Sequence, residues 1–571
     1  MKKNTLLLIS LTTLLQSITA QQPLVGAGNK VDPYKYTITK TATFNKASVA
    51  SAHPLASMVG AAIMQQGGNA FDAAIATQLA LAVVYPGAGN LGGGGFLLAR
   101  KKDGNLIGLD YREKAPASAS RDMYLDKEGT AQTTLSQNGH LSSGVPGTVA
   151  GLFATFPYAK LPFKTLIQPA IDLAEYGFVI TEHEARSLNG NKADFIKYST
   201  KRSAFIKDGE WKAGDTLIQK DLAETLKRIR DNGQKGFYEG LTAELIVNEM
   251  ERGNGLITLQ DLKDYSAKER KPVTFSYRGV EVVSFAPPSS GGILLAQMLK
   301  MAEKFPLNEY GFQSPKAVQL MVEVERRAYA DRAQYMGDPD FWKVPAKMLM
   351  SDTYLTQRMQ DYAVDKAGKS TNISYGILKE SEETTHLSIM DAEGNMVAVT
   401  TTLNNGYGSK TVVGGAGFLL NDEMDDFSIK PGVPNMYGAI GGEANAIQPG
   451  KRMLSSMTPT LLLKDNKPFV VVGTPGGTTI PTSVFQSIVN VVDFSMNAED
   501  AVNKPKFHHQ WLPDVVYIEK TFLTSTSEAL KQMGYTIEQR GAIGRTELIK
   551  INGGKLETAA DKRGDDSVAG F

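Results

Sequence analysis

Three short polar side chains, Thr384, Thr402 and Asn404, are spaced so that a β-hairpin would bring them together. Residues 384–391 and 395–403 both alternate like strands. The three residues between these segments end in glycine, as expected for a three-residue hairpin loop. The pattern therefore predicts a cluster of hydroxyl and amide groups at the open end of a hairpin.

The predicted register follows from pairing Asp391 with Asn395 across the loop. Thr384 then lies directly opposite Thr402, with the two Cβ atoms about 5 Å apart on one face. Thr401 points to the other face, so the change Thr401→Val is expected to be mild. A slip of one residue would break this arrangement, because neighbouring residues of a strand face opposite sides.

A threonine hydroxyl is a weak nucleophile unless a base lies beside it. If Thr384 began a chain, its own α-amine would be that base, since a free α-amine has a pKa of about 7.7–8. The polar segment 361–383 lacks an apolar period and indicates an exposed, mobile linker that ends at Glu383. Such a linker suits a precursor that cuts itself before Thr384. The same residues are also typical of an ordinary hairpin whose threonines only favour strand structure.

The elements around this hairpin are mixed. Residues 60–84 are predicted to form one helix, apolar most of the way round, and the glycine-rich segment 87–95 leads into a strand-like run at 96–99. No Lys-Ser/Thr pair follows these glycines, so they predict a close backbone approach and not a phosphate site. Residues 287–292 interrupt the chain, and 384–423 are strand-like. Few signs of βαβ order appear, which favours an α+β class.

Composition excludes several classes of function. The chain has 571 residues, 42% of them hydrophobic, with 61 Lys+Arg against 60 Asp+Glu and a formal charge of +1. This balance gives no indication of a nucleic-acid or membrane-surface partner. The absence of cysteine excludes disulfides, thiolate catalysis and cysteine-ligated metals. Small solutes or other proteins are the expected partners.

The first residues resemble a secretory signal. Lys2 and Lys3 precede an apolar stretch at 6–15, and small residues surround Ala20. The stretch is too short to span a membrane. We therefore assign residues 1–20 to a signal peptide and expect a free periplasmic or secreted protein.

The pair His508-His509 near Trp511 raises the question of a metal site. No third ligand is close in the sequence, so a structural role is predicted for both histidines. No metal and no other cofactor is expected.

Several motifs, read together and in order, resemble the γ-glutamyltransferase family. The resemblance covers nearly all of the chain after the signal, and this many motifs make it specific. They are Asn69, Gly92–Gly95, Asp110-Tyr111-Arg112-Glu113-Lys114-Ala115-Pro116, Thr384-Thr385-His386 through Asn404, Leu420-Asn421-Asp422-Glu423-Met424-Asp425-Asp426-Phe427-Ser428, Pro431-Gly432-Val433-Pro434-Asn435, Leu454-Ser455-Ser456-Met457-Thr458-Pro459-Thr460 and Gly473-Thr474-Pro475-Gly476-Gly477.

The resemblance implies a role for each matching residue. Thr384 is the expected nucleophile and first residue of a small subunit, and Thr402 is expected to hydrogen-bond it. The remaining roles concern the substrate. Its α-amino group would be held by Asn404, Glu423 and Asp426, its α-carboxylate by Arg112, Ser455 and Ser456, and the oxyanion by the backbone of Gly476 and Gly477.

The implied fold is the four-layer αββα sandwich of N-terminal-nucleophile hydrolases. Cleavage between Glu383 and Thr384 would give a large subunit, 21–383, and a small subunit, 384–571, which form one interwoven domain and a heterodimer. Tyr437 matches a lid-loop residue of many bacterial members. The implied activity is cleavage of γ-glutamyl amides such as glutathione or glutamine, with transfer to water or to an amino-acid or dipeptide acceptor. A glutaryl-type β-lactam acylase, or an uncut, non-catalytic secreted binding protein, is the alternative.

Overall fold

Two seven-stranded antiparallel sheets form the centre of the molecule. The computed structural model describes residues 24–372, 384–432 and 442–571. In sheet A the strand order is β19 (Ser567–Gly570), β2 (Ser48–Ser51), β10 (Thr385–Met390), β11 (Met396–Thr402), β3 (Gly94–Arg100), β4 (Leu106–Asp110) and β7 (Lys268–Glu269). In sheet B it is β1 (Thr41–Phe44), β18 (Lys555–Ala560), β17 (Glu547–Asn552), β13 (Lys467–Gly473), β12 (Thr460–Lys464), β9 (Val280–Ser284) and β8 (Val273–Tyr277).

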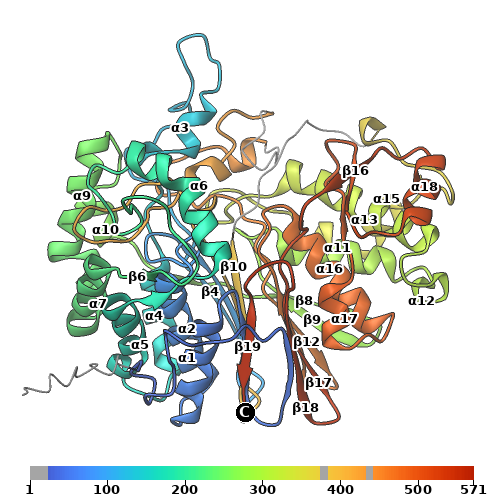
Figure 1. Cartoon of the computed structure of the whole chain (residues 1–571). Helices are drawn as coiled ribbons and strands as arrows, with labels where there is room; N and C mark the ends of the chain where they lie inside the picture. Colours follow the sequence, from blue (N-terminus) through green and yellow to red (C-terminus); the bar gives the residue numbers. More distant parts are fainter. Residues whose placement is uncertain (1–23, 373–383, 433–441) are drawn as a thin grey trace, which may run out of the picture.

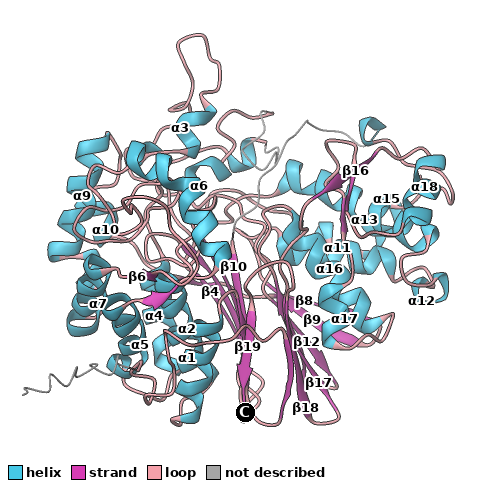
Figure 2. Ribbon diagram, in the orientation of Figure 1, coloured by secondary structure: helices cyan, strands magenta, loops and turns pink. Residues whose placement is uncertain are grey.

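Helices cover the outer face of each sheet (Figure 1). The layer on sheet A contains α1 (Pro54–Gln65), α2 (Ala70–Val84), α4 (Thr148–Thr155), α5 (Phe163–Tyr176), α6 (Glu182–Tyr198), α7 (Lys220–Asn232) and α9 (Gly240–Gly253). The layer on sheet B contains α11 (Gly291–Ala302), α13 (Pro315–Tyr335), α16 (Thr479–Val492), α17 (Ala498–Asn503) and α18 (Thr524–Gln532). Figure 2 shows the resulting order of helix, sheet, sheet and helix. The predicted α+β, four-layer αββα class is confirmed.

Shorter elements connect these layers. They are α3 (Thr133–Gln137), α8 (Lys235–Tyr238), α10 (Leu259–Lys263), α12 (Leu307–Tyr310), α14 (Ala346–Leu349), α15 (Asp352–Arg358), β5 (Phe178–Val179), β6 (Thr216–Leu217), β14 (Phe507–His508), β15 (Val516–Glu519) and β16 (Ile537–Arg540).

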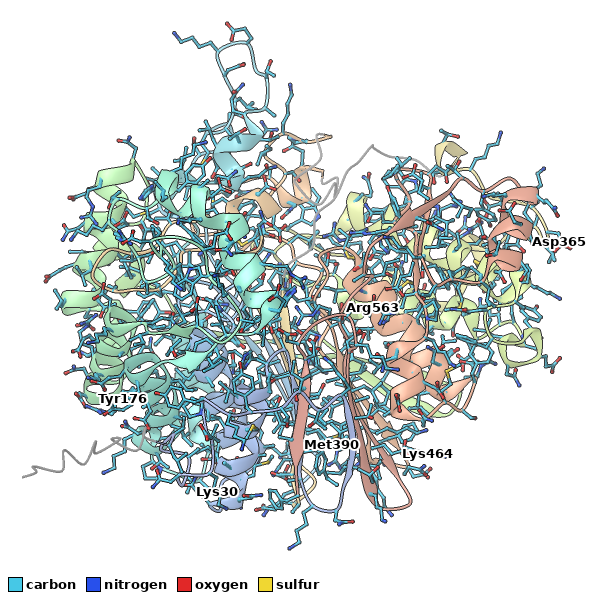
Figure 3. The ribbon with its side chains drawn as sticks, viewed as in Figure 1. Lys30, Tyr176, Asp365, Met390, Lys464 and Arg563 are labelled. Carbon is cyan, nitrogen blue, oxygen red and sulfur yellow. The ribbon has the colours of Figure 1, made fainter. Side chains whose placement is uncertain are left out.

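Alternation along the strands separates three buried regions. On β3, Leu97 and Ala99 pack under the helices of sheet A, whereas Phe96 and Leu98 pack between the two sheets. The same period on β11 sends Met396 into the space between the sheets. Side chains fill this space in Figure 3, where Met390, at the end of β10, is labelled. A residue's position along β10 or β11 therefore fixes whether it faces helices or the opposite sheet.

The predicted hairpin register is confirmed. Thr385 pairs with Thr401 and Met390 with Met396 across β10 and β11. Gly394 in the loop has φ +86°, the left-handed conformation that a three-residue hairpin loop requires. The register is local in origin, because the loop length sets which residues face one another.

The glycine-rich segment also behaves as predicted. A Cβ at Gly93 would collide with the carbonyl oxygen of Thr402, and one at Gly95 with that of Thr400. Only glycine allows β3 and the turn before it to lie this close to β11.

Two predictions about elements were wrong. Residues 60–84 form two helices, because Gly67 has φ +97° and the side chain of Asn69 caps α2. The strand-like segment ends at Thr402, and residues 403–423 are mostly turns. The predicted exposure of the linker is confirmed over most of its described part, because residues 361, 363–366, 369 and 371 are exposed. Ser370 is the exception, since it is 1% exposed and donates its hydroxyl to the Trp511 carbonyl. The rest of the predicted linker, 373–383, lies outside the described residues, as does the signal segment.

Two buried histidines make the free energy of unfolding depend on pH. His386 lies between the sheets and His508 at the end of β14, and both are fully buried. Desolvation lowers the pKa of each to about 3, from an ordinary value near 6.5. Both histidines are neutral in the folded protein at neutral pH, whereas an unfolded chain would protonate them below about pH 6.5. The stability they contribute is therefore complete above pH 6.5 and is lost as the pH falls toward 3.

We expect the free energy of unfolding to fall by about 2 kcal/mol for each of these histidines between pH 7 and pH 5. The free energy of unfolding of His508→Gln, measured by urea unfolding at both pH values, should fall by about 2 kcal/mol less than that of the wild type. The control is His183→Gln, because His183 is exposed. An unchanged pH dependence in His508→Gln would contradict this account.

Candidate active site

One pocket at the open end of the β10–β11 hairpin gathers almost all of the predicted site residues. Its lining includes Arg112, Thr384, Thr402, Asn404, Glu423, Asp426, Ser455, Ser456 and Gly477. Gly476 precedes Gly477 but does not line the pocket. Glu383 and Tyr437 lie outside the described residues. Segments more than 300 residues apart in the chain thus meet at Thr384.

Thr384 lies just before β10, at the edge of the space between the sheets. Its side chain is 5% exposed and lines the pocket together with that of Thr402. On the same face of the hairpin, one step further from the pocket, His386 pairs with Thr400 and their side chains are hydrogen-bonded at 2.8 Å. Thr401 faces the helical side, where its hydroxyl donates to the Gly94 carbonyl at 2.7 Å. The predicted difference in direction between Thr401 and Thr402 is confirmed.

Thr402 and Asn404 are held in a sharp turn after β11. The backbone N–H of Asn404 donates to the Thr402 hydroxyl oxygen at 2.7 Å, and the Asn404 amide donates to the Asp422 carbonyl at 3.0 Å. Asn404 has φ +79°, a left-handed conformation that asparagine adopts more readily than most residues. Because the Thr402 oxygen accepts this bond, its own proton can point into the pocket.

Arg112 is a fully buried cation at the carboxyl end of β4. Its backbone N–H donates to Asp110 at 3.0 Å and its carbonyl accepts from Tyr265 at 2.7 Å, which fixes the turn. The guanidinium pairs with Glu423 at 2.6 Å and with Asp426 at 2.5 Å. The neighbouring carboxylates raise the pKa of Arg112 further above its ordinary value. In the pocket without substrate, the expected carboxylate-binding and amine-binding groups therefore neutralise one another.

Glu423 and Asp426 lie on one short 3-10 helix, Glu423–Asp426, positioned by Asn421. The Asn421 side chain accepts from the Glu423 N–H at 3.1 Å and donates to the Gly92 carbonyl at 2.8 Å. Burial raises the pKa of the Glu423 carboxyl well above its usual range and also raises that of Asp426, although Arg112 opposes both shifts. An added ammonium group would favour the ionised form of these carboxyls.

Ser455 and Ser456 come from a loop clamped against residues 287–292. The Ser455 carbonyl accepts from the N–H and the hydroxyl of Ser290, both at 2.8 Å. The Ser456 hydroxyl oxygen accepts from Arg332 at 3.1 Å. The interruption at 287–292 is thus the support of this loop.

Gly476 and Gly477 have φ +135° and +54°, so glycine is required at this turn. Gly477 and Thr478 line the pocket immediately before α16. The N-terminus of this helix therefore lies at the pocket, where its positive end favours a developing negative charge.

Asn90 and Arg332 are among the residues of the site that had not been predicted from the sequence. Asn90 donates to the Thr402 carbonyl at 2.9 Å and accepts from the Gly93 N–H at 3.1 Å, so it joins the glycine-rich turn to β11. Its position within the glycine-rich segment is a signal that could have indicated it. Arg332 lines the pocket from α13. No local pattern distinguishes Arg332 from the other arginines of that helix.

We expect Thr402→Val to lower kcat about tenfold, because it removes the hydroxyl that lines the pocket with Thr384 and accepts from the Asn404 N–H, while keeping strand propensity. Thr401→Val should leave kcat per folded enzyme near the wild-type value. The effect on stability is expected to be larger, because the buried Thr401 hydroxyl also accepts from Asn90 at 3.2 Å. Its loss should cost about 1–3 kcal/mol. Steady-state kinetics and urea unfolding of both variants test this, and the opposite pattern would place the wrong threonine in the pocket.

His508 and His509 bond protein groups. His508 contacts Thr482 at 2.8 Å and Gln510 at 2.6 Å, and His509 accepts from the Trp511 N–H at 2.9 Å. Across residues 24–372, 384–432 and 442–571, no cluster of three acidic or histidine side chains is arranged to hold a metal ion. Within those same ranges, no helix is both long and apolar enough to cross a membrane.

Comparison with known proteins agrees with this geometry. The chain is 47% identical over 530 residues to the glutathione hydrolase proenzyme of Escherichia coli K12, covering 92% of this chain and 91% of that protein. The crystal structure of Helicobacter pylori gamma-glutamyltranspeptidase is 42% identical, with a TM-score of 0.56, and covers 60% of this chain and 97% of that one. A cephalosporin acylase from Bacillus halodurans is 26% identical, with a TM-score of 0.82, and covers 95% of this chain and 98% of its own.

A family model described as gamma-glutamyltranspeptidase matches residues 56–571, which include every described residue of the pocket. The chain belongs to the gamma-glutamyltranspeptidase family.

Proposed function

We propose that this self-processing γ-glutamyltransferase and glutathione hydrolase cuts itself between Glu383 and Thr384 and then uses Thr384 as its nucleophile. The large subunit would span 21–383 and the small subunit 384–571. The observation that carries the proposal is the position of Thr384, which immediately precedes a central strand and lines the pocket that contains the ion pairs of Arg112. Strands β10 and β11 of the small subunit lie between β2 and β3 of the large one, so the two pieces would share one sheet and stay together.

The proposed reaction has two stages. The Thr384 hydroxyl attacks the γ-carbonyl of the substrate while the α-amine of Thr384 accepts its proton. The resulting oxyanion is stabilised by the N–H groups of Gly476 and Gly477 and by the end of α16. The proton passes to the leaving amine, and a γ-glutamyl ester of Thr384 remains. Water then yields glutamate, or an amino acid or dipeptide accepts the acyl group.

The proposed recognition of the donor uses both of its α-charges. Asn404, Glu423 and Asp426 hold the α-ammonium, and Ser455 and Ser456 with Arg112 hold the α-carboxylate. Three features support this assignment: the buried carboxyl of Glu423 and the partly buried one of Asp426, both with raised pKa values, a buried guanidinium beside them, and two serines that line the same pocket. The α-ammonium and α-carboxylate of the donor would replace part of the ion pairing between Arg112 and the carboxyls of Glu423 and Asp426.

A second candidate is a glutaryl-type acylase, favoured by the structural similarity to the cephalosporin acylase. The α-amine separates the two, since a glutaryl group lacks it. We expect L-γ-glutamyl-4-nitroanilide to be cleaved at least about a hundredfold more efficiently than glutaryl-4-nitroanilide, because the glutaryl group has no ammonium to meet the carboxyls of Glu423 and Asp426. Equal kcat/KM values, or a preference for the glutaryl compound, would favour the acylase.

The proposed location is the periplasm or the exterior, and it rests on residues 1–20, which lie outside the described structure. Tyr437 is proposed as a lid residue over the donor, on the resemblance alone. No cofactor is needed for the proposed steps.

A further inference from the structure

The glycine turn before α16 is tied to the first turn of that helix. The Gly476 carbonyl accepts from the N–H and the hydroxyl of Thr479, at 2.9 and 2.7 Å. Because a trans peptide places its C=O and N–H on opposite sides, the Gly477 N–H points away from the helix. Gly477 and Thr478 line the pocket that also contains Thr384. The direction of this N–H therefore depends on how firmly the turn is held.

Thr478 is the point at which other elements hold the turn. Its carbonyl accepts from the hydroxyl of Tyr329 on α13, and its own hydroxyl donates to Gln510 Oε1 at 2.5 Å. A threonine at the N-cap of a helix ordinarily bonds an N–H of the first turn, but the Thr478 hydroxyl makes no such bond to α16. The Thr478 hydroxyl is thus bonded to Gln510 instead of capping its own helix.

Gln510 is a buried amide that is held by His508. Gln510 is 4% exposed, and its Oε1 lies 2.6 Å from His508 Nε2. An amide oxygen can only accept, so Nε2 carries the histidine proton and donates it. His508 is fixed in turn, because its Nδ1 lies 2.8 Å from the Thr482 hydroxyl and its ring packs edge-on against that of Tyr329. One oxygen of Gln510 therefore joins the turn at the pocket to a buried histidine.

A turn of this kind needs support from outside. Gly476 and Gly477 lack Cβ atoms, so the chain here has more accessible backbone conformations than any other pair of residues would allow. An oxyanion hole stabilises negative charge only if its donors already point to the place where the charge develops. Gln510 and Tyr329 restrict the turn from two elements that are distant in the sequence.

We propose that Gln510, held by His508, positions the turn 476–478 so that its N–H groups meet the oxyanion of the reacting carbonyl. This inference rests on the proposed function. Gln510 does not line the pocket, so it is a positioning residue that acts through Thr478. The buried pair His508-His509 thereby gains a connection to the reaction, through Gln510.

The test is the hydrolysis of L-γ-glutamyl-4-nitroanilide by Gln510→Met, which keeps the length of the side chain and removes the accepting oxygen. Both kcat and kcat/KM, expressed per matured enzyme from a denaturing gel, should fall about tenfold, while KM stays within about twofold of the wild-type value. The reason is that formation and hydrolysis of the ester both pass through an oxyanion, whereas binding of the donor does not. Complete removal of an oxyanion donor lowers kcat by about a hundredfold to a thousandfold, and a displaced donor should cost less.

Thr478→Val removes the other partner of the same hydrogen bond and should lower kcat by a similar factor. The double variant should be slower than either single variant by less than about twofold, because both changes act on one contact. If Gln510→Met does not fold, the comparison of Thr478→Val with Thr478→Ser decides. Thr478→Ser keeps the hydroxyl and should retain kcat within about threefold of the wild-type value, whereas equal losses in both variants would overturn the inference.

Gln486→Met is the matched control. Gln486 is also 4% exposed and bonds both backbone groups of Phe507, but it does not line the pocket. This variant should keep kcat and KM near the wild-type values. The inference would be overturned by wild-type kcat in Gln510→Met, by a loss confined to KM, by losses that multiply in the double variant, or by an equal loss of kcat in Gln486→Met. Failure of the wild-type enzyme to cleave the anilide would instead reject the proposed function.

Discussion

Replacing Thr384 with alanine is expected to give a single uncut chain whose kcat is lower by about a millionfold, the scale on which the loss of a nucleophile acts. The same hydroxyl is proposed to attack the Glu383 carbonyl during maturation and the donor carbonyl during turnover, so both reactions should stop together. Thr384 is 5% exposed at the pocket, and replacing its side chain with a methyl group introduces no steric clash. The variant should therefore remain folded.

A denaturing gel and N-terminal sequencing of the smaller band measure this outcome. The wild-type small subunit should begin with Thr384. Thr384→Ser is the matched control, because it keeps the hydroxyl and should still mature and turn over, although more slowly. A Thr384→Ala chain that still separates into two pieces at this bond would contradict self-cleavage by this residue.

Replacing Arg112 with glutamine should destabilise the protein by about 3–5 kcal/mol and remove most of its activity. The change leaves the buried carboxyl of Glu423 and the partly buried carboxyl of Asp426 without their cation, and breaking a buried ion pair from one side has a cost of this size. Raised pKa values already show that burial disfavours the ionised form of both groups. Without Arg112 these carboxyls should bind protons at neutral pH and lose affinity for an ammonium group.

Urea unfolding is best measured in the uncut Thr384→Ala background, where a single chain unfolds, and kcat/KM in the active enzyme. Arg121→Gln is a suitable control, because Arg121 pairs with Glu443 but its side chain is 48% exposed. That change should alter the free energy of unfolding by less than about 1 kcal/mol. Wild-type stability and wild-type kcat/KM in Arg112→Gln would show that the buried pairs support neither folding nor recognition.

The local geometry around Thr384 could be predicted from short-range sequence patterns. The loop 392–394 fixes the register of β10 and β11, and the period of two along a strand then separates Thr402 from Thr401. Both rules act within about twenty residues, which is why they could be applied before any tertiary structure was known. The glycine-rich segment was likewise identifiable, since a run of residues without Cβ implies a close backbone approach. The division of 60–84 into two helices was also locally encoded, although the prediction missed it.

The convergence of the site was decided only by the tertiary structure. The pocket brings together residues from four separate elements because the two sheets pack face to face. They are Arg112 at the end of β4, Arg332 on α13, Glu423 on its 3-10 helix and Ser456 on its loop. Family resemblance could name most of these residues, but it gave neither the pairing of Arg112 with Glu423 nor the presence of Arg332. Such contacts follow from burial of apolar side chains between distant segments, and local propensity contains no information about which distant segments will pack together.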